Sequence, residues 1–292
     1  MNSKISIVTI NYNSADETID FLKAIKDQSE TSYDIILVDN ASDKTDLDRL
    51  NLWLDKNYIQ GLHIIKNGIN SGFSGGCNLG IRNALENGSD WVILLNNDTI
   101  PTNRFCADLR AILRDKKGII GIPMDEGLKT AYCGKISWLK PALSHVHNMP
   151  KQCKGYYAIG GGMAIHKTVF SIIGLFDEKY FLYFEDADFS LRSSQAKMPF
   201  TIAGDIKVRH GVQASTKKIG SPNLLRYHYR NALYFNNKLG PYYIKILVWP
   251  WSILVAIKQL AKICIRRDLD HSWAILHGVM DFYMNRMGNI VN

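Results

Sequence analysis

The first hundred residues alternate between two sequence patterns, and this alternation constrains the fold more than any other feature. Short runs rich in β-branched residues are typical of strands, and the stretches between them have helical periodicity. Apolar strands that alternate with helices predict an α/β fold with a parallel sheet covered on both faces. We expect strands at Ile5–Ile10, Ile35–Val38, His63–Ile65 and Trp91–Leu95, and helices at about 15–29, 46–58 and 76–87.

Polar side chains follow each predicted strand, and in a parallel sheet the ligand site lies beyond these carboxyl ends. The strongest motif is Leu94–Thr99, in which a buried strand delivers Asn96, Asn97 and Asp98 to its end. An aspartate there can bind a hard divalent cation, which can bridge a diphosphate. The same residue types are common in turns and helix caps, so this motif alone also fits a structural role.

A glycine-rich segment, Asn70–Gly80, follows the third strand and leads into a helix. Backbone N–H groups at a helix start can bind an anion, so this segment is a weak indication of phosphate binding. It matches neither the GxGxxG motif nor the GxxxxGK[ST] phosphate loop, and its glycines also fit simple tight turns.

His210, at the end of a strand predicted at 206–210, is a candidate metal ligand, although a lone histidine is more often structural.

The segment Phe181–Arg192 carries three carboxylates directly after an aromatic run, at the start of a predicted helix. Asp188 and Arg192 are spaced i,i+4 and can pair on one helix face. That pairing leaves Asp186 or Glu185 free to face a cleft as a general base toward a hydroxyl. The helix N-terminus is expected to hold such carboxylates ionised. An acidic helix cap with an ion pair is the structural alternative.

Regular patterns become weaker in the middle of the chain. Between about 123 and 155 the periodicity fails, and a long irregular stretch in a compact domain is usually functional or mobile. Gly160–Gly162 interrupts a strand-like pattern over Tyr156–His166, as glycine does where a ligand or backbone approaches closely. A helix is predicted at about 185–197, and only helices are predicted from Pro222 onward.

The C-terminal part of the chain is strongly basic. Residues 206–292 hold 13 Lys/Arg and 3 Asp/Glu, whereas residues 1–205 hold 22 Lys/Arg and 24 Asp/Glu. Such an imbalance indicates an anionic partner, namely a membrane surface, a polyphosphate or a nucleic acid. A solvated basic surface that keeps the protein soluble is the alternative.

The helix expected after Pro250 combines a basic stripe with an apolar face, and Trp249 and Trp251 stand at its start. The basic residues are Lys258, Lys262 and Arg266, and the apolar ones are Ile253, Leu254, Ile257, Leu260, Ala261 and Cys264. This combination is typical of a helix that lies in a membrane interface. Packing on the rest of the chain or on a second subunit is the alternative.

Targeting and cysteine patterns favour a cytoplasmic location. We expect no signal peptide, because Asn11 ends the apolar run at 5–10. No apolar stretch reaches the roughly 18 residues of a spanning helix, and the longest, between Lys245 and Lys258, contains Pro250. The five cysteines are scattered without a CxxC pair, which argues against a disulfide framework or a cysteine-built zinc site.

The order and spacing of these motifs resemble those of a known family. The motifs are Ile7–Asn13, Val38–Asp43, Asn70–Gly80, Leu94–Thr99, Gly160–Ile165, Phe176–Arg192 and His210. Over about residues 4–215 the chain resembles the inverting family 2 glycosyltransferases of GT-A fold, and within them a rhamnosyltransferase-like branch. The resemblance implies a GT-A nucleotide-sugar-binding fold, with a Rossmann-like, mostly parallel central sheet and helices on both faces. A helical C-terminal extension would follow it.

The resemblance also implies which residues bind the donor. They are Thr9, Asn11, Asp39, Asn70, Gly72, Asn96 and Asn97. Thr9 and Asn11 are expected near the nucleoside, and Asp39 at the edge of the base. Asn70 and Gly72 are expected to border the nucleotide and sugar pocket.

The metal site and the general base are likewise implied by the resemblance. The family's DxD metal motif appears as Asn96-Asn97-Asp98, in which an asparagine replaces the first carboxylate. Asp98 would then be the principal ligand of Mg²⁺ or Mn²⁺, and His210 would complete the site. Asp186 matches the general base of the family, which takes the proton of an acceptor hydroxyl during direct displacement.

Substrates and partners follow from the same resemblance. The expected donor is dTDP-L-rhamnose, with UDP-hexose, UDP-galactofuranose and other deoxysugar donors left open. The expected acceptor is a lipid-linked oligosaccharide in the synthesis of a bacterial surface polysaccharide such as O-antigen or capsule. The protein would therefore lie on the cytoplasmic face of the inner membrane, with no nucleic-acid partner; a homodimer is compatible with these features.

We expect a catalytic domain over 1–220, with a nucleotide-binding half at about 1–100 and an acceptor-side half at about 101–220. A basic helical region would span 221–292 and contact a membrane or another subunit.

Three other classes of protein fit less well. An oxidoreductase lacks its GxGxxG motif, and a nucleic-acid-binding protein lacks a recognised module. A non-catalytic glycan-binding relative would normally have lost the base or a metal ligand.

Overall fold

The computed structural model describes residues 3–30, 32–211 and 221–290. Its first part alternates strands and helices as predicted, and each element lies close to its expected bounds. These elements are β1 (Ile5–Asn11), α1 (Ala15–Lys26), β2 (Asp34–Asn40), α2 (Lys44–Leu54), β3 (Leu62–Asn67), α3 (Gly72–Glu86) and β4 (Trp91–Leu95).

A seven-stranded sheet forms the centre of the molecule, in the order β13-β6-β12-β4-β1-β2-β3. Its other strands are β6 (Ile119–Gly121), β12 (Gly162–His166) and β13 (Phe200–Ile202). β12 is antiparallel to both neighbours, whereas all other pairs in the sheet are parallel. The mostly parallel sheet is therefore confirmed. The strand order reverses between β1 and β4, and such a switch point is where α/β sheets bind ligands.

Both faces of the sheet are covered in its middle, where the strands are mostly apolar and buried. Successive side chains of a strand point to opposite faces. Ile7 of β1 accordingly joins a hydrophobic cluster with Phe21 of α1. The next residue, Val8, joins a second cluster with Ile81 of α3. All five residues of β4 are buried, as expected for the middle of a covered sheet.

The segment between 123 and 155 is more regular than its sequence indicated. It contributes β7 (Met124–Asp125), β8 (Thr130–Ala131), β9 (Cys133–Lys135) and β10 (Ser144–Val146), and is followed by β11 (Tyr156–Tyr157). These strands form two small sheets. One has the order β10-β9-β11. The other has the order β5-β14-β7-β8 and includes β5 (Thr99–Pro101) and β14 (Val208–His210). Strands of two or three residues are too short to produce a periodic pattern, which is why the prediction missed them.

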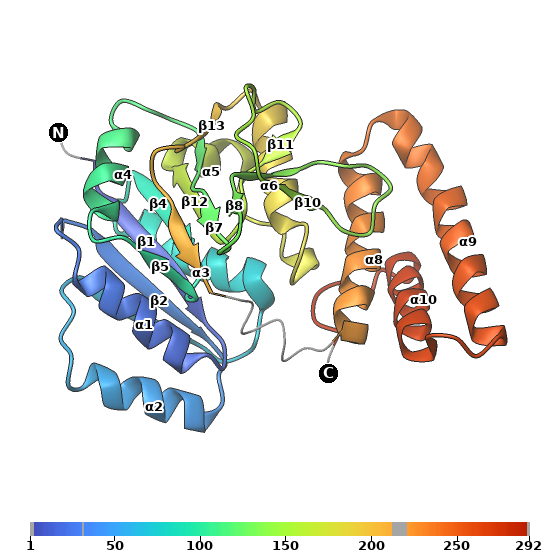
Figure 1. The fold of residues 1–292 in the computed structure, drawn as a ribbon, viewed down its shortest axis with the longest axis horizontal. Helices are drawn as coiled ribbons and strands as arrows, with labels where there is room; N and C mark the ends of the chain where they lie inside the picture. Colours follow the sequence, from blue (N-terminus) through green and yellow to red (C-terminus); the bar gives the residue numbers. More distant parts are fainter. Residues whose placement is uncertain (1–2, 31, 212–220, 291–292) are drawn as a thin grey trace.

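The remaining helices lie on the sheet or form the C-terminal end of the molecule (Figure 1). α4 (Phe105–Leu113), α5 (Lys167–Ile173) and α6 (Glu185–Gln195) belong to the α/β part. α8 (Ser221–Leu239), α9 (Tyr242–Cys264) and α10 (Leu269–Tyr283) follow, as the prediction of helices alone required. The expected boundary at 220/221 borders residues 212–220, which lie outside the described part of the chain.

α9 differs from the sequence-based expectation in two respects. Pro250 lies inside the helix instead of limiting it, so α9 is a continuous helix of 23 residues. By length and composition it is apolar enough to cross a bilayer, contrary to our expectation, although one such helix does not establish a span. Arg266 lies beyond the helix end, so the basic stripe on α9 ends at Lys262.

Candidate active site

Two predicted donor residues, Asn11 and Asp39, meet at the ends of neighbouring strands. β1 and β2 pair in parallel with Asn11 opposite Asp39, and both side chains are buried. The Asn11 amide donates to Asp39 Oδ1 at 3.0 Å and also contacts Ser42 and Asp46. These hydrogen bonds fix the Asp39 carboxylate at the strand end.

Two other predicted donor residues, Thr9 and Asn97, are buried in the surrounding structure. Thr9 Oγ1 lies within β1 and has no hydrogen-bond partner among the described residues. Asn97 Nδ2 donates to the hydroxyl groups of Ser14 and Thr18, both at 2.7 Å. The Asn97 amide therefore holds the start of α1 against the end of β4.

The glycine-rich segment packs against the turn that leads into α6. Asn70 Oδ1 accepts hydrogen bonds from Asn40 Nδ2 at 3.1 Å and from the Gly72 N–H at 2.9 Å. Gly72 has a φ of +71°, and a Cβ there would lie 2.3 Å from the Phe181 carbonyl oxygen, so only glycine fits. The Phe73 N–H donates to the same carbonyl at 2.7 Å. The glycine-rich segment, which is predicted to bind the donor, is thus in direct contact with the turn that leads to Asp186.

The structure brings together the two predicted metal ligands, Asp98 and His210. β5 and β14 pair in antiparallel fashion with Thr99 opposite His210. Asp98 Oδ1 consequently lies 3.4 Å from His210 Nε2. Burial alone would lower the pKa of His210, but the neighbouring Asp98 carboxylate outweighs it and raises that pKa.

Asp98 and His210 fit a divalent cation. Asp98 Oδ1 is buried, and apart from its 3.4 Å contact with His210 it has no partner within the described residues, so it is available as a ligand. A carboxylate oxygen and an imidazole nitrogen suit Mn²⁺, and Mg²⁺ often takes one or two carboxylates besides substrate phosphates. Over residues 3–30, 32–211 and 221–290 no group of three or more His, Cys, Asp and Glu side chains forms a candidate metal site. A cation here would therefore complete its ligand shell with diphosphate and water.

Gly160 and Gly161 lie between the Asp98 region and α6. The Gly160 N–H donates to Asp186 Oδ2 at 3.0 Å. The Asn96 N–H donates to the Gly161 carbonyl oxygen at 3.1 Å, and a Cβ on Gly161 would lie 2.5 Å from Asn96 Nδ2. The predicted close approach of backbone at this glycine run is confirmed. It joins the end of β4 to the candidate base.

Asp186 and Glu185 begin α6, and burial raises the pKa of both. The pKa of Asp186 is raised although its carboxylate accepts backbone hydrogen bonds from Gly160 and Ala187. Burial, together with the charge of Asp186, raises the pKa of Glu185 well above its usual range, and Glu185 Oε2 lacks a described partner. Burial therefore opposes the stabilisation of negative charge that a helix N-terminus provides. A raised pKa makes the deprotonated Asp186 a stronger base.

Buried charges tie α6 to the C-terminal helix α8. The predicted pair of Asp188 and Arg192 is confirmed, with 2.6 Å between Oδ1 and Nε. Asp188 also accepts hydrogen bonds from Tyr180 Oη at 2.9 Å and from Lys238 Nζ at 2.6 Å. Lys238 belongs to α8 and lies 2.7 Å from Asp177 as well. The orientation of α6 therefore depends on α8.

Asn231 of α8 holds the turn that precedes Asp186. In this turn Phe181, Tyr183 and Phe184 have φ values of +60°, +70° and +74°, which non-glycine residues rarely adopt. Asn231 is fully buried, and its Nδ2 donates to the carbonyl oxygens of residues 180, 182 and 183 at 2.8, 2.7 and 3.1 Å. Sequence reasoning missed Asn231 and Lys238. α8 contains several other polar residues, so no local signal singled these two out.

An Asn231→Ala substitution is expected to destabilise this turn and to slow catalysis. It removes the shared amide donor of three carbonyl oxygens, of which only that of Tyr180 keeps other donors within the described part of the chain, the Leu182 N–H and Arg230. A lost buried hydrogen-bond partner costs about 1–3 kcal/mol of unfolding free energy. Denaturant unfolding and initial transfer rates measure the two effects. The matched control is Asn103→Ala, which removes an exposed amide. Equal behaviour of the two variants would contradict the positioning role of Asn231.

Comparison with known proteins decides the family. The family profile described as "Glycosyl transferase family 2" matches residues 6–173, more than half of the chain. The chain belongs to glycosyl transferase family 2. Among curated members, it is 28% identical over 229 residues to "dTDP-rhamnosyl transferase RfbF" of Shigella flexneri, covering 77% of this chain and 74% of that protein. It is 24% identical over 311 residues to "Low-salt glycan biosynthesis hexosyltransferase Agl10" of Haloferax volcanii, covering 99% and 94%.

Solved structures of glycosyltransferases share the GT-A fold of this family 2 member. The mannosyltransferase PcManGT from Pyrobaculum calidifontis, in complex with GDP-Man and Mn²⁺, superposes with a TM-score of 0.58 at 13% identity. That match covers 98% of this chain and 88% of PcManGT. TarS of S. aureus superposes with a TM-score of 0.53 at 14% identity, and this family 2 chain spans 40% of its length. At these identities the similarity establishes the fold alone.

Proposed function

We propose that this family 2 glycosyltransferase moves a sugar from a nucleotide-sugar donor to an acceptor hydroxyl with inversion at the anomeric carbon. One observation carries the proposal. Gly160 contacts Asp186 and Gly161 contacts Asn96, so the candidate base and the Asp98 region meet at one glycine run. A base and a diphosphate-binding group at adjacent positions are what a direct displacement requires.

In the proposed reaction Asp186 removes the proton from the acceptor hydroxyl. The acceptor oxygen forms a new bond to the anomeric carbon while the bond from that carbon to the diphosphate oxygen breaks. The leaving group departs from the opposite face, and the configuration inverts. A divalent cation bound by Asp98 and His210 would neutralise charge on the departing nucleoside diphosphate. The GT-A relative PcManGT was solved with Mn²⁺, which supports such a cation.

We propose donor roles for the strand-end residues as the family resemblance implies. Asp39 reads the base edge, with Asn11 holding its carboxylate and Thr9 beneath the nucleoside. Asn70 and Gly72 border the nucleotide and the sugar. Asn96 and Asn97 support the end of β4, where Asn97 is anchored to α1.

The preferred donor is dTDP-L-rhamnose, in keeping with the similarity to the dTDP-rhamnosyl transferase. UDP-hexose and UDP-galactofuranose are the alternatives, and the longer match to a hexosyltransferase favours keeping them. The proposed acceptor is a lipid-linked oligosaccharide at the cytoplasmic face of the inner membrane, within O-antigen or capsule synthesis. We propose a catalytic domain over 1–220 and a separate helical region over 221–292.

Thermal denaturation with candidate donors tests this proposal. A ligand that binds only the folded state raises the melting temperature by mass action, with about 2.7 kcal/mol of stabilisation at 100 times its Kd. We expect dTDP-L-rhamnose with Mn²⁺ to give a larger shift than UDP-glucose or UDP-galactofuranose at equal concentrations. A larger shift with a UDP-sugar would reassign the donor. Absence of a shift with every nucleotide-sugar would favour a non-catalytic relative.

A further inference from the structure

Exposed apolar side chains of this protein concentrate on its C-terminal helices. Of the 22 large hydrophobic residues that are exposed in the described chain, 15 lie between Tyr242 and Met284. Those 15 are Tyr242, Tyr243, Ile246, Leu247, Trp249, Ile253, Leu254, Ile257, Leu260, Ile265, Leu269, Trp273, Met280, Tyr283 and Met284. We call this set the C-terminal apolar surface. Soluble monomers rarely expose so many apolar side chains together, and such surfaces mark contacts with a membrane or a protein.

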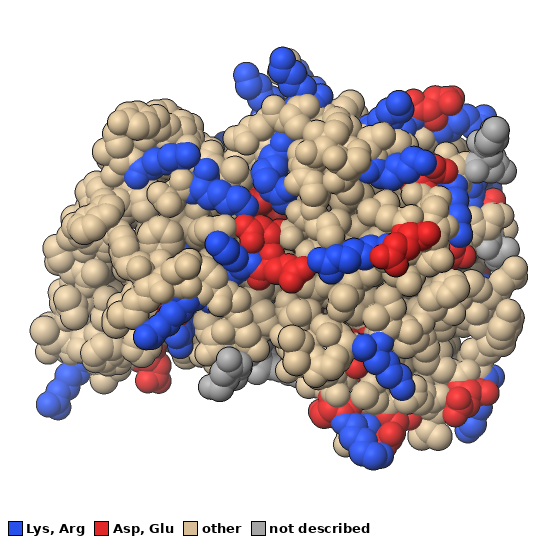
Figure 2. Space-filling view, turned by 180° about the vertical axis from the view of Figure 1, so that it is seen from behind, with Lys and Arg blue, Asp and Glu red and all other residues tan. Residues whose placement is uncertain are grey.

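The packing of α9 explains why this surface is left uncovered. α9 buries only Ile244, Val248, Ser252 and Gln259, a narrow stripe along one side. The opposite side exposes Ile246, Leu254 and Ile257 by 56%, 66% and 57%. Figure 2 shows the C-terminal helices at the left of the view as a broad uncharged surface with Lys and Arg at its borders. No described segment covers this surface, so a partner that covers it must come from outside the described residues.

The charges around the C-terminal apolar surface point to an anionic lipid bilayer. α9 contains three Lys residues, at positions 245, 258 and 262, and no Asp or Glu. Arg266 and Arg267 follow in the exposed turn to α10, in which Asp268 pairs with Lys262 at 3.1 Å. Asp270 is the acidic residue in the first turn of α10, so the basic residues outnumber the acidic ones around this surface. Exposed Trp and Tyr with basic residues at the border are typical of helices in a membrane interface. A second copy of this chain would bring the same basic helix, and α9 has no Asp or Glu to pair with those cations.

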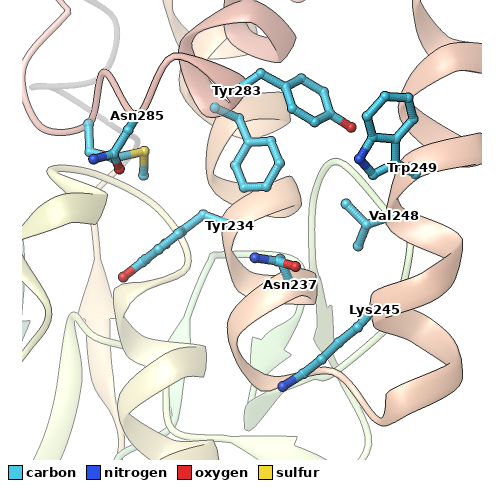
Figure 3. A pocket seen from close by; sticks show the side chains of 9 residues that line it. Tyr234, Asn237, Lys245, Val248, Trp249, Tyr283 and Asn285 are labelled. Carbon is cyan, nitrogen blue, oxygen red and sulfur yellow. The ribbon is translucent and has the colours of Figure 1, made fainter.

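A cavity beside this surface has the mixed character that a lipid headgroup requires. It lies among α8, α9 and α10 with a volume of about 360 Å³. Figure 3 shows Lys245 and Trp249 of α9 lining it opposite Tyr234 and Asn237 of α8, with Tyr283 of α10 beside them. An ammonium group and an amide next to aromatic rings can bind a phosphate and the first methylene groups of its chains.

We propose that α9 and α10 bind the surface of an anionic bilayer, with the C-terminal apolar surface inserted among the headgroups. Lys258, Arg266 and Arg267 then contact lipid phosphates. This proposal does not depend on which donor the active site uses. It explains how the α/β domain would reach the lipid-linked acceptor proposed above.

Vesicle binding by the full chain tests the proposal. We expect sedimentation with vesicles of phosphatidylcholine and phosphatidylglycerol at low salt, and at least about tenfold weaker binding to phosphatidylcholine alone. High salt should also weaken binding, because it screens the headgroup charge. The triple variant Trp249→Ser, Leu254→Ser, Ile257→Ser should bind at least about tenfold more weakly, since it removes three inserted side chains.

The controls separate membrane binding from folding, from catalysis and from dimerisation. The triple variant Leu52→Ser, Leu128→Ser, Ile172→Ser removes exposed apolar residues elsewhere and should bind vesicles like the wild type. The double variant Lys258→Glu, Arg266→Glu should lose the preference for anionic vesicles while donor binding in solution stays unchanged. The proposal is overturned if the wild type ignores anionic vesicles, or if the control triple loses binding equally. It is also overturned if the Trp249 triple only converts a dimer to a monomer in analytical ultracentrifugation.

Discussion

The Asp186→Asn variant is expected to keep its fold and its donor affinity and to lose sugar transfer by about 10²–10⁴-fold, the usual cost of removing a general base. The amide has nearly the shape of the carboxylate but cannot accept the proton of the acceptor hydroxyl. Its oxygen can still accept the hydrogen bond from the Gly160 N–H. Initial rates, together with donor affinity from calorimetry, separate loss of chemistry from loss of binding.

Glu185→Gln is the matched control for this experiment. Glu185 is the adjacent carboxyl group, and burial raises its pKa well above the usual range. Glutamine keeps the size and shape of this side chain and removes its ability to ionise. We expect this variant to retain turnover close to that of the wild type. If Glu185→Gln loses activity while Asp186→Asn keeps it, the general base is Glu185 and the assignment to Asp186 is incorrect.

The pH profile gives a second measurement of the same residue. Activity requires deprotonated Asp186, so the rate falls as pH drops through the pKa of this group. Burial raises that pKa, while two backbone hydrogen bonds and the charge of His145 oppose the shift without cancelling it. The acid limb of kcat/KM should therefore lie above the ordinary aspartate value of about 4. An acid limb at or below that value would contradict the role of Asp186 as base.

Asp98→Ala is expected to weaken binding of the nucleoside diphosphate in the presence of Mn²⁺ by at least about 10–100-fold. Substitution of groups that merely support metal ligands already costs that much. His210→Ala should act in the same direction, because His210 Nε2 lies 3.4 Å from Asp98 Oδ1. Without divalent ions, Asp98→Ala and the wild type should bind the diphosphate almost equally.

The control for the metal prediction is Asp108→Asn, which changes an aspartate on α4 that pairs with Arg104 at the surface. It should leave Mn²⁺-dependent binding unchanged. EDTA should abolish transfer by the wild type, and added Mg²⁺ or Mn²⁺ should restore it. Full activity in EDTA, with diphosphate affinity unaffected in both Asp98→Ala and His210→Ala, would rule out the proposed metal site.

Local patterns predicted the sheet and the pairs that lie close in sequence. The apolar run Trp91–Leu95 is a strand because five consecutive apolar residues fit a sheet covered on both faces. Asp188 and Arg192 pair because residues four apart share a helix face. The juxtaposition of Asp98 and His210 came from the family resemblance, since no local pattern places β5 beside β14.

Other features depend on tertiary packing and could not be read from the sequence. The raised pKa of Glu185 results from burial by surrounding elements, whereas its place at a helix start suggested the reverse. Asn231 contacts a turn about fifty residues earlier, and nothing in its own helix marks that contact. Pro250 was expected to interrupt a helix that the structure continues through it. The family profile ends at residue 173 and therefore includes neither Asp186 nor His210.

The three hydrogen bonds of Asn231 determine where a chimera between two related transferases can be joined. The first C-terminal helix supports the base-bearing turn, whereas the exposed apolar residues begin only at Tyr242. Gly240 and Pro241 separate these two roles in the sequence. A chimera that takes its membrane-facing helices from another transferase must therefore be joined after Leu239. A junction near residue 221 would replace the native support of Asp186 along with the helices, and would confuse a change of membrane affinity with a loss of catalysis.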